Sequence, residues 1–198
     1  FFYVVNGYKS GNPDFKTAFG NEMAVSLFCS VSPDESAPCD AEWPQYMCNN
    51  NNTGASASQV NTPILKIWEF NVGSYVYSAP VVSGGKAIFG ADDNKLYALD
   101  ENSGTKIWEY TTGGKARSSP AVANGKVFFG STAPDTNVYA LDESTGTKIW
   151  EYQTFNLGGV SGIKDAPAAA YGKVFAASGY VLYALDQDDG EKIWEFNA

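Results

Sequence analysis

The sequence contains no histidine, one arginine and three cysteines among its 198 residues. Without histidine, neither a Ser-His-Asp nor a Cys-His nucleophile system can form, and no imidazole can hold a metal. The 22 acidic residues outnumber the 13 basic ones, giving a formal charge of −9, so a phosphate-backbone partner is not expected. No apolar run reaches the ~18 residues of a membrane-spanning helix. The composition thus argues against nucleic-acid binding, membrane spanning and histidine-dependent catalysis.

Aromatic and turn-forming residues are abundant. Hydrophobic residues make up 44% of the chain and aromatic residues 15%, beside 20 glycines and 9 prolines. Such a chain can bury a core, and its many turn formers predict short strands joined by tight turns. The length suits one domain, or one domain with an appendage.

The three cysteines, Cys29, Cys39 and Cys48, lie within twenty residues of one another. Their spacings of ten and nine match no zinc motif. They are either reduced thiols of a cytosolic protein, or one disulfide and a leftover thiol in an exported protein. We favour the disulfide and an extracytoplasmic location, because the Pro/Asn/Ser-rich segment around the cysteines has little core to stabilise it. Which two cysteines pair stays open.

An internal repeat occupies the C-terminal two thirds of the chain. The tetrapeptide Lys-Ile-Trp-Glu occurs four times, at spacings of 40, 42 and 44 residues, and Tyr-Ala-Leu-Asp occurs three times. Each unit reads as four short strands, with an Asp-x-x-x-Gly turn before the last one, and about forty residues is the period of a β-propeller blade. The repeated positions are the tryptophans Trp68, Trp108, Trp150 and Trp194, the aspartates Asp100, Asp142 and Asp186, and the glycines Gly104, Gly146 and Gly190.

The repeat predicts an all-β fold of β-propeller-type blades. We expect three four-stranded blades at about 77–111, 118–154 and 164–198, and one extra outer strand around Trp68, within a repeat domain of residues 64–198. Residues 1–63 do not show the repeat and form an irregular Cys/Asn-rich region. This region is either an appendage or a degenerate blade.

The pattern Pro-Val-Val-x-Gly-Gly-Lys, followed by Leu-Tyr-Ala-Leu-Asp-x-x-x-Gly-x-Lys-Ile-Trp-Glu, resembles the pyrroloquinoline-quinone (PQQ) repeat over about residues 66–198. The resemblance implies that each outer-strand tryptophan packs between adjacent blades, near the Asp/Gly turn of a neighbour. The repeated tryptophans, aspartates and glycines are therefore expected to be blade-docking residues. Quinone-dependent dehydrogenases of this family also use an adjacent cysteine pair and a calcium set, which are not identifiable here. We therefore expect no enzymatic activity, no cofactor and no metal.

Two groups of charged residues have alternative interpretations. The pairs Asp92-Asp93 and Asp188-Asp189 could bind calcium weakly, although no calcium-loop spacing is present, and solvated loop charge is the preferred interpretation. The basic residues Lys115 and Arg117 could face the ring axis and bind an anion.

Three functions are compatible with these features. The first is a non-catalytic structural or assembly protein that self-associates head to tail, as a surface layer or filament. The second is a four-bladed scaffold that binds a protein partner, and the third is a relative of a quinone-dependent dehydrogenase. The first is favoured because three blades are fewer than the usual minimum of four for a ring. An apolar segment, Phe1, Phe2, Tyr3, Val4 and Val5, is in addition a template for strand addition.

Overall fold

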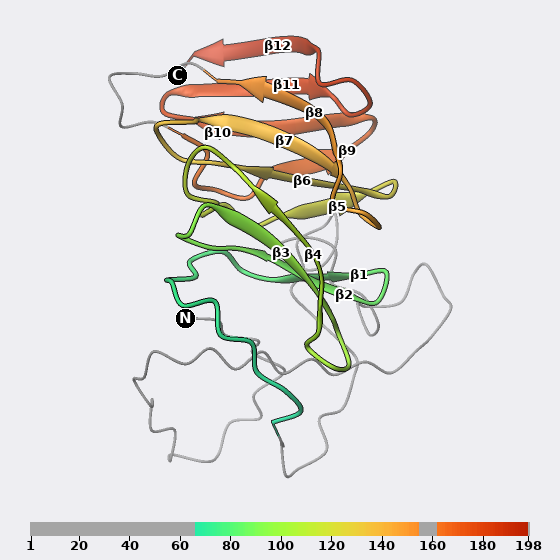
Figure 1. Cartoon of the computed structure of the whole chain (residues 1–198). Helices are drawn as coiled ribbons and strands as arrows, with labels where there is room; N and C mark the ends of the chain where they lie inside the picture. The colour runs from blue at the N-terminus through green and yellow to red at the C-terminus, as the bar shows by residue number, and fades with distance from the viewer. Residues whose placement is uncertain (1–65, 155–161, 198) are drawn as a thin grey trace, which may run out of the picture.

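Three four-stranded antiparallel sheets follow one another along the chain (Figure 1). The computed structural model describes residues 66–154 and 162–197, which contain strands and no helix, and hence no helix that could span a membrane. In each sheet, strands that are consecutive in sequence pair with one another. The predicted all-β fold with three four-stranded repeats is confirmed.

Each sheet is built from one repeat. The first contains β1 (Val81–Ser83), β2 (Lys86–Gly90), β3 (Lys95–Asp100) and β4 (Lys106–Thr111). The second contains β5 (Ala121–Ala123), β6 (Lys126–Gly130), β7 (Asn137–Asp142) and β8 (Lys148–Gln153). The third contains β9 (Ala168–Ala170), β10 (Lys173–Ser178), β11 (Val181–Asp186) and β12 (Lys192–Asn197).

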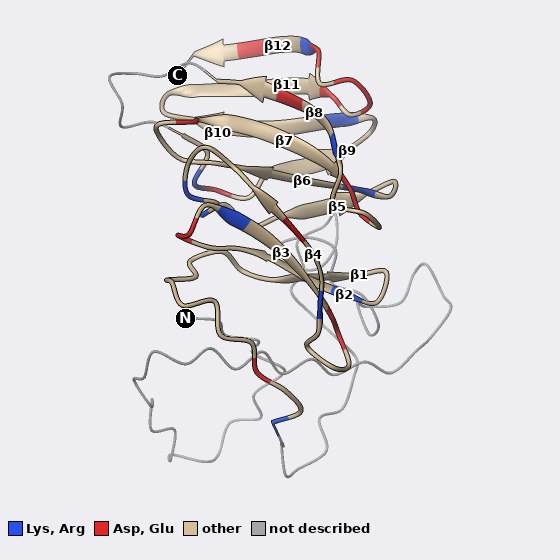
Figure 2. Cartoon of the chain, in the orientation of Figure 1, with Lys and Arg blue, Asp and Glu red and all other residues tan. Residues whose placement is uncertain are grey.

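The central strands of the first two sheets are apolar on both faces because each of these sheets is covered on both sides. In β2 the consecutive residues Ala87, Ile88 and Phe89 are all buried. Phe89 pairs across the ladder with Tyr97, and their rings stack with centroids 5.6 Å apart. The outer strands differ, since β4 exposes most of its side chains and buries only the tryptophan. The charged residues lie on the outer strands, in the turns and at the ends of the central strands (Figure 2).

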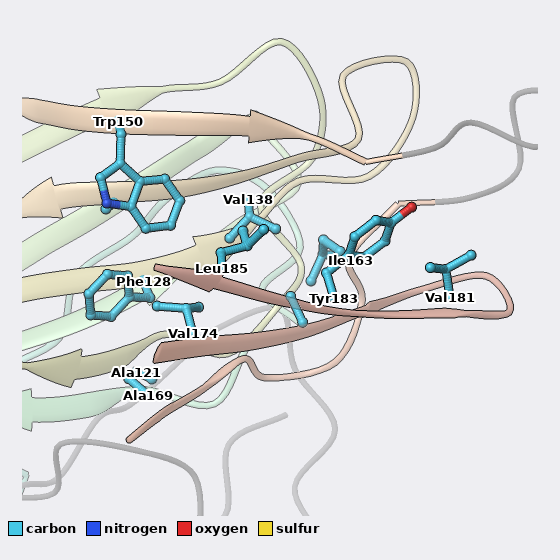
Figure 3. Close-up of a cluster of buried hydrophobic side chains, with 12 residues drawn as sticks. Ala121, Phe128, Val138, Trp150, Ile163, Ala169, Val174, Val181, Tyr183 and Leu185 are labelled. Atoms are coloured by element: carbon cyan, nitrogen blue, oxygen red, sulfur yellow. The ribbon is translucent and has the colours of Figure 1, made fainter. Parts of the chain in front are cut away.

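The sheets pack face to face, and side chains that alternate along a strand enter different layers of the core. Ile88 faces the second sheet, whereas its neighbours Ala87 and Phe89 pack with Trp68, from the segment that precedes β1. Between the second and third sheets, Phe128, Trp150 and Val138 meet Val174, Tyr183 and Leu185 (Figure 3).

Two of the predicted features differ from the structure or lie outside the residues that it describes. We expected an extra copy of the outer strand around Trp68. The structure describes this segment from Lys66 onward, and it does not form a strand there, although Trp68 itself is buried. The predicted N-terminal region of residues 1–63, with its cysteines and its first five apolar residues, lies outside the described residues. The domain boundaries and the cysteine pairing therefore remain predictions.

Candidate blade-docking site

The Asp-x-x-x-Gly turn forms one half of a site that occurs at each described boundary between repeats. In the turn before β8, the Gly146 amide donates to the Asp142 carbonyl at 2.9 Å, and Gly146 has a φ of +71°. Asp142 Oδ1 accepts hydrogen bonds from the side chains and amides of Ser144 and Thr145. The side-chain hydroxyls, followed by the backbone amide, lower the pKa of Asp142 to about 2. The aspartate thus stays ionised and orders the turn.

The other half of the site is a tryptophan from the preceding repeat. Three of the four repeated tryptophans are 7–8% exposed, and their indole Nε1–H donates to the carbonyl of the residue after the turn aspartate. The donor–acceptor pairs are Trp68 with Glu101 (2.8 Å), Trp108 with Glu143 (3.0 Å) and Trp150 with Gln187 (3.1 Å).

The turn glycine is required because the indole lies directly on it. A Cβ added at Gly146 would lie 2.7 Å from Trp108 Cδ2, which is closer than real Cβ contacts allow. The same distance is 2.6 Å for Gly104 on Trp68 and for Gly190 on Trp150. The structure thus brings together the glycines with three of the tryptophans that the sequence singled out. Their contribution to docking stays a prediction until it is measured.

Trp194 has the same sequence context but a different environment. It is 41% exposed, and the ring contact described for it is with Phe175 of its own sheet, at 5.9 Å between centroids. No Asp-x-x-x-Gly turn lies against it in the described part of the chain. Trp194 is therefore the tryptophan half of a docking site for which the described residues supply no turn, since the turn of the third sheet already receives Trp150.

Ion pairs also cross the boundaries between the sheets, and the sequence reading did not identify them. Lys86, in the first sheet, lies 3.9 Å from Glu143 in the turn of the second sheet. Lys126, at the equivalent position of the second sheet, pairs with Asp188 in the turn of the third. Each pair joins the start of a β2-type strand to the turn of the next repeat. An alignment of the repeats with one another would have revealed the lysines but not their partners.

A second close approach involves glycines at the end of the β2-type strands. A Cβ added at Gly90 would lie 2.2 Å from the carbonyl oxygen of Ala116, and one at Gly130 would lie 2.0 Å from Ile163 Cβ. Both partners belong to the segment that leads into the next sheet. In the third sheet this position is Ala177, which is exposed.

Serine hydroxyls anchor the segments that lead into β1 and β5. Ser78 Oγ accepts from the Gly90 amide at 2.7 Å, and Ser118 Oγ accepts from the Gly130 amide at 2.7 Å. Both serines are completely buried. The third repeat has Asp165 at this position, which is exposed. The signal that could have revealed these residues is the Ser-x-Pro motif shared by the first two repeats.

Lys115 and Arg117, which the sequence suggested as an anion site, both bind an aspartate of the same chain. Arg117 binds Asp92 through Nε and Nη2, each at 2.7 Å, and Lys115 Nζ lies 2.9 Å from the same carboxylate. The Arg117 hydrogen bond holds the pKa of Asp92 below its usual value. Arg117 also lies over the Tyr77 ring, at 4.8 Å. The anion-site hypothesis is therefore replaced by an internal ion-pair network.

The acidic pairs considered for calcium are also engaged with the protein. Asp93 accepts hydrogen bonds from the Tyr97 hydroxyl and the Lys95 amide, and Asp188 pairs with Lys126. Asp189 accepts from the Glu191 amide at 2.9 Å. Burial, and then the bond to Asp93, raise the pKa of Tyr97. Within residues 66–154 and 162–197, no group of three or more cysteine, aspartate or glutamate side chains could hold a metal ion.

The stacked four-stranded sheets with their repeated tryptophan–turn contacts define a protein of β-propeller repeats. The family model described as outer membrane protein assembly factor BamB, a PQQ-like repeat family, matches residues 48–197, and the chain belongs to this family. The predicted family resemblance is thereby confirmed. No curated protein matches the sequence.

Solved structures with the same fold come from both dehydrogenases and an assembly factor. Quinohemoprotein alcohol dehydrogenase from Comamonas testosteroni is 27% identical, with a TM-score of 0.72, over 83% of this chain and 28% of that one. A europium-containing methanol dehydrogenase is 23% identical, with a TM-score of 0.65, over 79% of this chain and 32% of that one. BamB from Moraxella catarrhalis is 18% identical, with a TM-score of 0.60, over 89% of this chain and 50% of that one.

These likenesses differ in what they support. The chain spans half or less of the length of each of these three structures. At 23% and 18% identity, the likenesses to the methanol dehydrogenase and to BamB show the fold alone. The fold is shared by enzymes and by an assembly factor, so the fold itself does not decide between them.

Proposed function

We propose that this chain is a non-catalytic, extracytoplasmic structural or assembly protein that uses its blade-docking surfaces to bind protein. In the form that we favour, copies of the chain associate head to tail, as in a surface layer or filament. The chain belongs to a family whose model is described as outer membrane protein assembly factor BamB, and this supports both the assembly role and the extracytoplasmic location. The expected partner is a second copy or another protein.

The observation that carries the proposal is the environment of Trp194. Its three counterparts are 7–8% exposed and hydrogen-bonded, whereas Trp194 is 41% exposed. Phe196, its neighbour on the same face of β12, is 61% exposed, and Leu182 is 38% exposed. An aromatic patch of this kind, on a face that is buried in both other repeats, is typical of a surface that binds protein.

Sedimentation velocity tests this proposal. The wild-type chain should show a mass above 21.3 kDa that rises over a roughly hundredfold range of concentration, because association follows mass action. Trp194→Ala should remove this rise, whereas Tyr180→Ala should not. Tyr180 is a suitable control because it is 72% exposed in the turn between β10 and β11 of the same sheet. A wild-type chain of constant monomer mass would contradict self-association.

The second candidate function is that of a relative of a quinone-dependent dehydrogenase, and the 27% identity to the quinohemoprotein alcohol dehydrogenase favours it. Ultraviolet-visible titration of the protein with pyrroloquinoline quinone and calcium distinguishes the two. A non-catalytic assembly protein should leave the quinone spectrum unchanged. A saturable spectral shift that requires calcium would instead support the dehydrogenase relation.

A further inference from the structure

Two segments of the chain are identical over six residues but lie in different environments. Lys66–Asn71 and Lys192–Asn197 both read Lys-Ile-Trp-Glu-Phe-Asn, whereas the two intermediate copies have tyrosine in place of the phenylalanine. The first segment lies against the first sheet, where Trp68 is 8% exposed. The second segment is β12, where Trp194 is 41% exposed. Chemically identical segments can occupy the same receiving site.

The third sheet carries a complete donor face. In the first sheet the residues that face the second are Val81, Ile88, Leu96 and Trp108, and all four are buried. The aligned positions of the third sheet are apolar as well. Three of them are exposed, namely Ala168, Leu182 and Trp194, and Phe175 is half-buried.

The first sheet carries the matching receiving face. In the second sheet the residues that receive Trp108 and its neighbours are Val127, Phe129, Tyr139 and Leu141. The aligned positions of the first sheet are nearly the same residues: Ala87, Phe89, Tyr97 and Leu99. In this structure the receiving face is covered by the segment with Trp68 and Phe70, which is not a strand of any of the three sheets.

Charge complementarity identifies the same two surfaces. Both internal boundaries pair a lysine at the start of a β2-type strand with an acid in the next turn, as in Lys86 with Glu143. The third sheet supplies Lys173 at the lysine position, and the first sheet supplies Glu101 in its turn. Among the described residues, neither Lys173 nor Glu101 forms a salt bridge with another residue.

We propose that the third sheet of one copy docks on the first sheet of a second copy, with Trp194 taking the place of that copy's Trp68. This inference rests on the proposed self-association and specifies its surfaces. The indole of Trp194 donates to the carbonyl of Glu101 in the second copy and lies on Gly104. Lys173 pairs with the Glu101 side chain across the same boundary. The displaced segment is the second copy's Lys66–Asn71.

Ala177 makes this contact weaker than the internal ones. At the aligned positions Gly90 and Gly130, an added Cβ would lie 2.2 and 2.0 Å from the segment that leads into the next sheet. In the docked pair Ala177 meets the aligned residue of the second copy, Val76, so the two surfaces cannot approach as closely. Ala177→Gly should therefore tighten association by roughly tenfold, measured as the concentration of half-association.

Charge reversal across the boundary is the first test, because Lys173 and Glu101 are both partly exposed and the variants should fold. Lys173→Glu alone and Glu101→Lys alone should each weaken self-association by about tenfold or more, since like charges then meet. An equimolar mixture of the two variants should restore it, because every boundary between unlike copies again joins opposite charges. Lys164→Glu is the control, since Lys164 is exposed in the segment before β9.

Removal of the resident tryptophan is the second test. Trp68→Ala should shift half-association to a concentration at least roughly tenfold lower, because the competing segment loses its anchor. Trp68→Ala combined with Trp194→Ala should be monomeric. Circular dichroism should show whether each variant keeps its strands, and the charge-reversal mixture gives an answer that does not depend on Trp68.

The outcomes separate this inference from the proposed function. The proposed contact between the third and first sheets would be overturned if the single charge variants associate like the wild type, or if their mixture does not recover association. In that case, dissociation of Trp194→Ala would still support self-association. A wild-type chain that stays at 21.3 kDa at every concentration would overturn both. Loss in the single variants with recovery in the mixture would establish the contact between the third and first sheets.

Discussion

Alanine at Trp108 should destabilise the protein more than alanine at Trp194, although both residues lie in the same tetrapeptide. Trp108 is 8% exposed and Trp194 is 41% exposed. With about 200 Å² of side-chain surface and about 25 cal/mol per Å², burial contributes about 4–5 kcal/mol for Trp108 and about 3 kcal/mol for Trp194. Trp108 also loses its hydrogen bond to Glu143, worth about 1 kcal/mol. The expected difference in the free energy of unfolding is about 2–3 kcal/mol.

Urea unfolding at a protein concentration below that of association measures this difference for the isolated chain. In a thermal experiment, a chain of this size should melt about 5–10 °C lower for Trp108→Ala than for Trp194→Ala. Equal losses in the two variants would refute the reasoning, because they would show that the boundary between the first and second sheets adds nothing to the environment of Trp108.

Three further predictions concern the turns, the ion pairs and the cysteines. Gly125→Ala should lower the free energy of unfolding by about 1 kcal/mol, and Gly146→Ala should lower it several times more. Both glycines have a positive φ, but only Gly146 lies on an indole. Equal urea midpoints for the two variants would contradict this. Asp92→Asn should lower stability at pH 7 by about 1–2 kcal/mol. Arg117 lowers the folded pKa of Asp92 below 3.8, so the stabilisation by Asp92 is present above about pH 4 and is lost as the pH falls toward the folded pKa. The stability of Asp92→Asn should therefore fall less steeply with acid than that of the wild type. An equally steep fall in both proteins would count against the ion pair. Non-reducing peptide mapping of the native protein should find one disulfide among its three cysteines, and three free thiols would contradict the exported assignment.

The repeat made most of the fold predictable, because strand-length apolar runs and turn residues recur in register. Positions such as Trp108 and Gly146 were identified together, since both stand at fixed places in each unit. The carbonyl that Trp108 binds was not identified, because a backbone acceptor leaves no signature in the side chain at Glu143. The pairing of Arg117 with Asp92 was also missed, because the two residues are 25 positions apart and meet only after the sheets stack.

One difference between the repeats could have been seen in the sequence and was not. Ala177 stands where the other two repeats have glycine, and its meaning becomes clear only from the close approach at Gly90 and Gly130. No blade could be predicted within residues 1–63, because they contain neither the repeat nor a regular alternation of apolar and polar residues. Their charge and composition alone do not specify strands.

The indole N–H resonances of the protein, labelled with ¹⁵N at tryptophan and assigned with single Trp→Phe variants, test the central claim most directly. If the third sheet docks on a receiving turn, the Trp194 indole resonance should move with rising protein concentration toward the positions of Trp108 and Trp150, as it gains a carbonyl acceptor. The resonances of Trp108 and Trp150 should not move, because their acceptors are already present within the chain. A Trp194 resonance that is independent of concentration and still exchanges rapidly with water would contradict the account.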